Sequence, residues 1–441
     1  MSSISPAQPE QDLASTASLR QLSTICWALL LVGFVVPLTV VVLISHRPPD
    51  GDFAGFYALG RILNTHPMAD LYNYELQKQV CSQVHARAGG YGLLPYPPFV
   101  GIFFQPFALL PYAAAYVLWL LITLGLYAAG LKLLLDRFLP LDPVRRSLVF
   151  CFAFAYCPFP IDTAASGQLS AVAFFVLSAA LCQDDAGHLF RSGLLMSLCL
   201  YKPTLLVLLL PMLLVTRRFR SLLGFATGAV ALVGLPTAIG GFGIWTIFLR
   251  TLLTFGKIAG GTQAGGTLIL VKYVDLTSFS SFVHGGRSRP GLALLLLCAS
   301  ATAVFLLRFW WTAPRRGKPF NALLWATTIT WTLLLNVYVP MYDSILIVLA
   351  LLVTAAALQQ IPGRPMQRAF AALWILILAG SWFSGWLDGR TSVQLLTLLF
   401  AALGVLEFVA LGRISLAQPG SAHPVPGSAA TDRPACAGSS P

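Results

Sequence analysis

The 441-residue chain contains only 16 Asp and Glu residues, so its candidates for acid–base chemistry can be considered completely. Half of them fall in segments that we expect to face the outer side of a membrane or its boundary: Asp50, Asp52, Asp70, Glu75, Asp162, Asp275, Asp343 and Asp388. A proton or ion pathway would place acids near the middle of the bilayer, whereas chemistry on lipid-linked molecules would gather them at one face. The distribution favours the second kind of protein.

Asp52 is the most informative of these acids. It follows the first long apolar run by a few residues and directly precedes an apolar helical stretch, residues 56–63. It can be read as the N-cap of that helix. A carboxylate fixed beside the membrane surface can also take a proton from a hydroxyl, as a general base does. The two interpretations are compatible.

Three other polar side chains lie where apolar segments meet the same face. Gln168 follows Gly167 in a hairpin, which is either a tight turn or an amide that holds a sugar hydroxyl. Lys202 precedes Pro203, and its ammonium can snorkel to the interface or pair with a phosphate. Asp343 heads an apolar run, where an acid is costly without a partner or water.

Other polar groups have a simpler interpretation. The prolines that follow Tyr96 set turn geometry at the start of the second apolar region. The second long loop has charges between glycine-rich stretches, which form either a mobile lid or a solvated surface: Lys257, Lys272, Asp275, His284, Arg287 and Arg289.

The eight cysteines show no CxxC spacing, and Cys81 with His85 is insufficient for a metal site. We therefore expect neither a metal nor a cofactor.

The composition determines the class of protein that positions these groups. Apolar residues make up 57% of the chain and charged residues only 10%, against roughly 25% charged in soluble domains. Residues 25–45 carry no charge at all. The chain is therefore a multi-pass all-α membrane protein. The formal charge of +12 reflects short basic loops on the cytoplasmic side, so it does not indicate a nucleic-acid partner.

The charge pattern also predicts the topology. We expect disordered cytoplasmic tails at residues 1–24 and 413–441, and between them a membrane domain, residues 25–412, of roughly ten to twelve helices. Long exoplasmic loops span residues 46–96 and 240–289, with interfacial helices at 56–63 and 245–255. The apolar runs 169–182 and 204–215 are too short to cross a bilayer, and nearby prolines predict broken helices around a protein-enclosed cavity.

Taken in order, these motifs resemble glycosyltransferase family 87. The resemblance rests on Asp52, Phe56-Tyr57, Leu71-Tyr72, Tyr96-Pro97-Pro98-Phe99, Leu110-Pro111, Gly167-Gln168, Lys202-Pro203 and Tyr342-Asp343. It implies a GT-C-type helical bundle in the cell (inner) membrane with a cytoplasmic N-terminus. It also implies that the protein transfers a hexose, with mannose as the first candidate, from a polyprenyl-phosphate donor to a hydroxyl of a lipid-linked or glycan acceptor. The transfer would take place at the exoplasmic face and invert the anomeric centre.

The resemblance also assigns roles. Asp52 matches the family's first-loop carboxylate, the general base, and Lys202 is the first candidate for the cation that meets the leaving phosphate, ahead of Arg287 and Arg289. The other expected substrate-binding residues are Tyr57, Tyr96, Gln168, Tyr342 and Asp343. Val337 replaces the usual proline of the late motif, and the glycine before Leu71-Tyr72 is missing, which leaves the acceptor open.

Two other functions stay open at this point. A transporter or flippase of a lipid-linked saccharide would fit the membrane domain, although neither inverted repeats nor ionisable residues near the middle of the membrane support it. A structural assembly partner would need none of the exoplasmic carboxylates.

Overall fold

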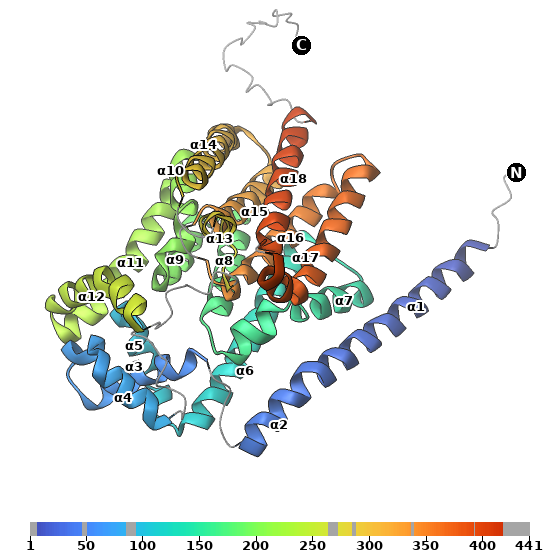
Figure 1. Ribbon diagram of the computed structural model, residues 1–441. Helices are drawn as coiled ribbons and strands as arrows, with labels where there is room; N and C mark the ends of the chain where they lie inside the picture. The colour runs from blue at the N-terminus through green and yellow to red at the C-terminus, as the bar shows by residue number, and fades with distance from the viewer. Residues whose placement is uncertain are drawn as a thin grey trace, which may run out of the picture.

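The computed structural model describes residues 7–45, 51–84, 94–262, 272–284, 288–336, 339–391 and 393–417. Within them the chain folds into helices, and the β pairing consists of one isolated bridge between Tyr273 and Pro340. Figure 1 shows the helices gathered into one bundle, with the first span running along its side. The prediction of an all-α membrane protein is confirmed.

The expected count of ten to twelve spans is not supported by the described residues. By length and composition, seven helices in the described residues can cross a membrane, or eight if one bent pair is a single span. The first span, Ala17–Val40, lies in three consecutive elements: α1 (Ala7–Leu30), η1 (Leu31–Val35) and α2 (Val36–Ser45). The other six are α6 (Tyr112–Phe138), α11 (Phe219–Gly240), α14 (Arg289–Thr312) with the turn after it, η10 (Met341–Ile345) with α16 (Leu346–Leu358), α17 (Arg364–Thr391) and α18 (Leu395–Ala417).

Breaks at prolines explain the lower count. The bent pair is α7 (Pro143–Phe154) and η5 (Pro158–Ala165), which meet at 61° and enclose the break before Pro158. Further along, α9 (Leu189–Ser197), η6 (Leu198–Tyr201), η7 (Pro203–Leu206) and α10 (Leu209–Val215) form short pieces on either side of Lys202. The apolar runs of this region are therefore short helices, as their length and the nearby prolines predicted.

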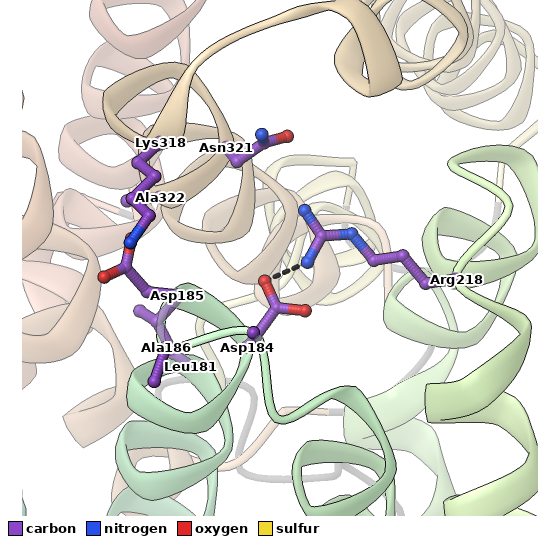
Figure 2. Close-up of a pocket in the computed structure, with 9 residues that line it drawn as sticks. Leu181, Asp184, Asp185, Ala186, Arg218, Lys318, Asn321 and Ala322 are labelled. Atoms are coloured by element: carbon purple, nitrogen blue, oxygen red, sulfur yellow. Dashed lines mark ion pairs between the residues drawn. The ribbon is translucent and has the colours of Figure 1, made fainter.

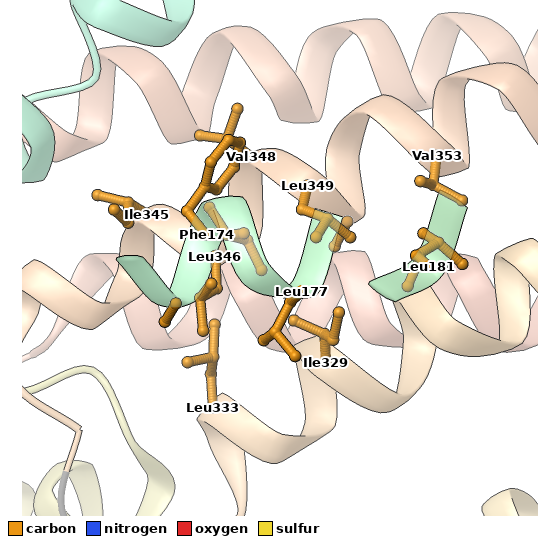
Figure 3. Packing of buried hydrophobic residues seen from close by; sticks show 14 of the residues in the cluster. Phe174, Leu177, Leu181, Ile329, Leu333, Ile345, Leu346, Val348, Leu349 and Val353 are labelled. Carbon is orange, nitrogen blue, oxygen red and sulfur yellow. The ribbon is translucent and has the colours of Figure 1, made fainter. Parts of the chain in front are cut away.

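The core surrounds α8 (Ser170–Asp185), which is only 16 residues long. It is buried on nearly all sides and packs against α15 (Lys318–Leu334) and α16. Figure 3 shows Phe174, Leu177 and Leu181 of α8 among Ile329 and Leu349 of these two helices. A helix that is apolar all round belongs in the interior, so α8 fixes its first residue, Ser170, within the bundle.

The same bundle encloses Glu407, which lies in the middle of α18 and is fully buried. Its Oε1 atom accepts hydrogen bonds from Thr330 of α15 at 3.2 Å and Thr354 of α16 at 3.0 Å. Buried carboxyl groups need such partners. Glu407 therefore joins three helices.

The N-terminal tail is shorter than expected. α1 begins at Ala7, so residues 7–24, expected to be disordered, are helical. Ala, Gln, Glu and Leu are strong helix formers, and this segment continues directly into an apolar span that stabilises it. At the other end α18 continues to Ala417, past the expected boundary at residue 412. Residues 1–6 and 418–441 lie outside the described residues.

Shorter helices gather beside the start of α6, at the lower left of Figure 1: α3 (Phe53–Thr65), α4 (Tyr74–Val84), α5 (Pro98–Phe104) and α12 (Gly243–Thr262). The predicted helices at 56–63 and 245–255 are confirmed as α3 and α12. α13 (Leu276–Val283) is a further short helix, in the second long loop. The candidate site lies where the start of α3 meets the bundle.

Candidate active site

The Asp52 side chain does not cap its helix. Asp52 is the N-cap residue of α3, and its backbone carbonyl accepts bonds from the amides of Gly55 and Phe56, but its carboxylate makes no capping bond. Instead, Oδ2 accepts a hydrogen bond from the side-chain amide of Gln168. The capping interpretation is therefore wrong for the side chain, and the carboxylate points to a residue far along the chain.

A tight turn at Gly167 brings Gln168 to Asp52. Gly167 has φ +73°, and a Cβ there would lie 2.6 Å from the Cβ of Phe53, so glycine is required for both reasons. The carbonyl of Ser166 accepts a bond from the amide of Phe53 at 3.0 Å. From α6, Trp119 donates to the Gly167 carbonyl at 2.9 Å and Tyr116 to the Ala165 carbonyl at 2.8 Å. The turn is thus fixed to both α3 and α6.

The same turn reaches the two other segments predicted from the sequence. Tyr201, the neighbour of Lys202, donates its hydroxyl to the carbonyl of Leu169 at 3.1 Å. Ser170 donates to Oδ1 of Asp343 at 2.7 Å. Ser170 was not among the predicted site residues, although its position two residues after Gln168 was a usable signal. The segment that runs through this turn into the start of α8 therefore joins Asp52, Lys202 and Asp343 into one cluster.

Lys202 and Asp343 form an ion pair inside this cluster. The Lys202 ammonium contacts Oδ2 of Asp343, and only 14% of the lysine side chain and 1% of the aspartate side chain are exposed. The ammonium also lies 4.8 Å from the ring centroid of Tyr342, at cation–π distance. Asp343 thus has the partner that its position required. The ion pair accounts for the position of the Lys202 ammonium without snorkelling, while phosphate binding stays a prediction.

The electrostatics of Asp52 follow from its surroundings. Burial raises the pKa of its carboxyl group above the ordinary value. The hydrogen bond from Gln168 and the positive charges of Lys202 and Lys272 act in the opposite direction on this pKa. A carboxylate with a raised pKa is a stronger base than a solvated one, and the neighbouring donor and cations keep its charged form accessible.

Two predicted tyrosines lie at the edge of the cluster. Tyr96 has its ring centroid 6.4 Å from that of Tyr201, in a nearly parallel stack, and 5.0 Å from that of Phe56. Tyr57 donates its hydroxyl to the carbonyl of Leu110 at 2.8 Å, so this hydroxyl joins α3 to the Leu110-Pro111 motif. Substrate binding by either tyrosine stays a prediction. Arg287 lies outside the described residues.

Asp275, expected among the charges of a lid or solvated loop, is instead a structural anchor. It is fully buried, caps α13 by accepting bonds from Ser278, and accepts the amide of Val339 at 3.0 Å. The amide of Val274 donates to the Val339 carbonyl at 3.0 Å. This part of the second long loop is therefore fixed to the segment that leads into Tyr342 and Asp343.

Comparison with known families decides the class of protein. The family model of glycosyltransferase family 87 matches residues 94–337, more than half of the chain. The chain belongs to glycosyltransferase family 87. No curated protein and no solved structure matches it. It is therefore a membrane glycosyltransferase, and the resemblance noted in the sequence is confirmed at the level of the family.

The matched range divides the site of this family 87 glycosyltransferase. Gln168, Ser170 and Lys202 lie within residues 94–337, whereas Asp52 and Asp343 lie outside them. The structure brings both acids to the matched part, Asp52 through Gln168 and Asp343 through Ser170 and Lys202. The acids on either side of the matched region are therefore part of the same cluster.

The glycosyltransferase also has a polar pocket at the far end of α8. Figure 2 shows this cavity of about 210 Å³, where Asp184 and Arg218 form an ion pair with Lys318 and Asn321 nearby. Because α8 begins at Ser170 and ends at Asp185, the pocket lies roughly 22 Å from the cluster. It is separate from the Asp52 site.

In the described residues no group of three His, Cys, Asp or Glu side chains could hold a metal.

Proposed function

We propose that this glycosyltransferase transfers a hexose from a polyprenyl-phosphate donor to a hydroxyl of a lipid-linked or glycan acceptor. The family resemblance favours mannose as the hexose. Transfer occurs at the exoplasmic face of the cell membrane and inverts the anomeric centre. The observation that carries the proposal is the joining of a partly buried carboxylate, Asp52, and a partly buried cation, Lys202, through one turn. A single-displacement transfer needs one base and one group that stabilises the leaving phosphate.

Asp52 is the general base in this reaction. It takes the proton of the acceptor hydroxyl while the oxygen attacks the anomeric carbon, the glycosyl–phosphate bond breaks and the phosphate leaves with the electron pair. The transition state has oxocarbenium character, so proton removal and charge stabilisation both lower the barrier. The bond from Gln168 fixes the direction of the carboxylate and supports its ionised form.

Lys202 stabilises the leaving phosphate. Its ammonium has three N–H donors, and the ion pair with Asp343 fixes its position without using all of them. The ring of Tyr342 lies beside the same ammonium and limits its movement. Asp343 is thus a positioning residue for the cation, and its own position is set by Ser170.

The arrangement of charges supports the proposed orientation. The far end of α8 is rich in cations: Arg137 pairs with Asp185, Arg218 with Asp184, and Lys318 lines the same pocket. Basic residues prefer the cytoplasmic side. The opposite end of α8, where Asp52 lies, then faces the exoplasm, and the N-terminus lies in the cytoplasm.

The experiment that tests the function is sugar transfer by purified protein in detergent, with a polyprenyl-phosphate hexose and membrane lipid acceptors. We expect Asp52→Asn to lower kcat by about 10²- to 10⁴-fold, the usual contribution of a general base. Glu75→Gln is the matched control, because Glu75 is an exposed carboxylate on the neighbouring helix α4 and should be dispensable. The anomeric configuration of the product, determined by NMR, tests inversion.

Full activity of a folded Asp52→Asn protein would refute the role of the base. Absence of transfer from every polyprenyl-phosphate hexose, with transfer from a nucleotide sugar, would refute the donor class. Because the reaction is run in detergent without a membrane gradient, transfer under these conditions also excludes transport as the primary activity.

A further inference from the structure

An apolar groove separates the first span from α6. It encloses a cavity of about 470 Å³. Leu30, Phe34 and Leu38 of the first span line one side, and Val117, Leu121 and Leu124 of α6 line the other. Phe159 and Pro160 of η5 contribute to the same groove, called here the α1–α6 groove. None of its lining residues is charged, so it suits a hydrocarbon ligand.

In the described side chains, the polar contacts that anchor the first span to the bundle lie in its N-terminal part. There, Ser23 shares a hydrogen bond with Ser147 of α7, and the Trp27 indole donates to the same hydroxyl, both at 2.9 Å. The Trp27 ring also packs against Phe154 at 6.2 Å. Beyond Trp27 the span continues through the π-helical segment η1, Leu31–Val35, which widens its turns. The groove begins at the last of these anchors, Trp27, and continues along the span.

The groove is continuous with the elements that build the candidate site. Val117 and Leu121 face it from α6, while Tyr116 and Trp119 on the other face of the same turns hold the turn at Gly167. Phe159 and Pro160 line the groove from η5, and η5 ends at Ala165, where that turn begins. A molecule in the groove therefore lies against the scaffold of the Asp52 cluster.

The size and chemistry of the groove indicate an extended chain. Its lining residues on the first span run from Trp27 to Thr39, about 18 Å at 1.5 Å per residue. The indole N–H of Trp27 and the hydroxyl of Thr39 both bond within the protein, so they do not bind a polar ligand. We propose that the α1–α6 groove binds the isoprenoid chain of the lipid-linked donor. This inference rests on the proposed function for the identity of the donor.

Binding is tested on the full chain in lipid nanodiscs with a polyprenyl phosphate that carries a diazirine in its isoprenoid chain. After irradiation, we expect mass spectrometry to place the label on the first span near Phe34 and on α6 near Leu121. Unlabelled polyprenyl phosphate should remove the label, whereas an equal amount of phosphatidylglycerol should leave it. Equal competition by phosphatidylglycerol would mean that ordinary lipid fills the groove, and labelling of other helices would place the chain elsewhere; both outcomes overturn the proposal.

A matched pair of variants tests the consequence for activity. Leu121→Trp fills the groove, whereas Leu118→Trp adds the same bulk to the same helix outside the groove; Leu118 and Leu121 are 42% and 60% exposed. We expect Leu121→Trp to raise the KM for a long-chain donor at least tenfold and to leave the KM for a donor with one or two isoprene units unchanged. Leu118→Trp should resemble the native protein with both donors. Equal effects of the two variants would overturn the proposal.

The two proposals fail separately. If the groove is labelled specifically but no polyprenyl-phosphate hexose is consumed, then the donor assignment fails and the lipid-binding site stands. If transfer depends on Asp52 but the label lies outside the groove, then the enzyme functions as proposed and the chain-binding site is wrong.

Discussion

The ion pair between Lys202 and Asp343 allows structural and chemical roles to be separated. We consider Lys202→Met, Asp343→Asn and the double variant, all of which keep side-chain length or shape close to the native residues. Lys202→Met leaves a carboxylate, 1% exposed, with Ser170 as its remaining partner. Asp343→Asn leaves an ammonium that is 14% exposed beside a neutral amide. The double variant removes both charges.

The magnitudes follow from burial. Removing one partner of a buried ion pair typically costs about 3–5 kcal/mol, because the other charge is left uncompensated, whereas replacing both by neutral groups is often nearly neutral. We expect the free energy of unfolding to fall by about 3–5 kcal/mol in Lys202→Met and by less in Asp343→Asn, since water reaches part of Lys202. The double variant should lie within about 1 kcal/mol of the native protein.

Two measurements on the same samples separate the roles. Reversible unfolding in mixed micelles, followed by tryptophan fluorescence, gives the coupling free energy of the pair. Initial rates of transfer give kcat and KM. If Lys202 stabilises the leaving phosphate, the double variant is as stable as the native protein, yet its kcat is lower by about 10²- to 10³-fold, the usual loss on removal of one such group.

Two results would refute this reasoning. A cost below about 1 kcal/mol for Lys202→Met would show that the pair is not held in a buried, low-dielectric environment. Recovery of both stability and activity in the double variant would show that Lys202 has only a structural role, and the phosphate would then need another cation.

Two further predictions concern the turn and the base. The hydrogen bond from Gln168 and the charge of Lys272 both lower the pKa of Asp52. Gln168→Leu and Lys272→Ala should therefore each move the acid limb of the pH profile of kcat/KM to higher pH, while Lys272→Arg keeps the native profile. A shift of the acid limb to lower pH would contradict the role of Asp52 as the base. Gly167→Ala should lower the free energy of unfolding by about 1–3 kcal/mol, measured in the same micelles, because of its φ of +73° and the contact with Phe53; unchanged stability would show that the turn relaxes freely.

The sequence determined the class of protein and much of the candidate chemistry. A charged fraction of 10% cannot cover a soluble surface, so the membrane domain followed from composition alone. The number of spans did not follow, because hydropathy and run length do not show how helices broken at prolines are arranged in the bundle. α8 is only 16 residues long and is buried on nearly all sides, so it lies inside the bundle without being long enough to span it.

Asp52 could be selected from the sequence, but the role of its side chain could not. Spacing allowed a helix cap, and only the tertiary structure shows that the carboxylate bonds to Gln168, 116 residues further on. The buried anchor Asp275 was read as a loop charge for the same reason, since its partner Val339 lies 64 residues away. The local sequence pattern predicts where a helix starts, but it does not predict hydrogen bonds between segments that are far apart in the chain.

The sequence by itself determined that Lys202 and Asp343 needed explanation, because a charge at the end of an apolar segment is costly unless it has a partner. Only the tertiary structure shows that Lys202 and Asp343, 141 residues apart, form an ion pair with each other. It also shows that Ser170 and the turn at Gly167 bring this pair to Asp52. The physical reason is that the cost of burying a charge is a property of one residue and its surroundings, whereas its compensation depends on which distant segments the packed helices bring into contact.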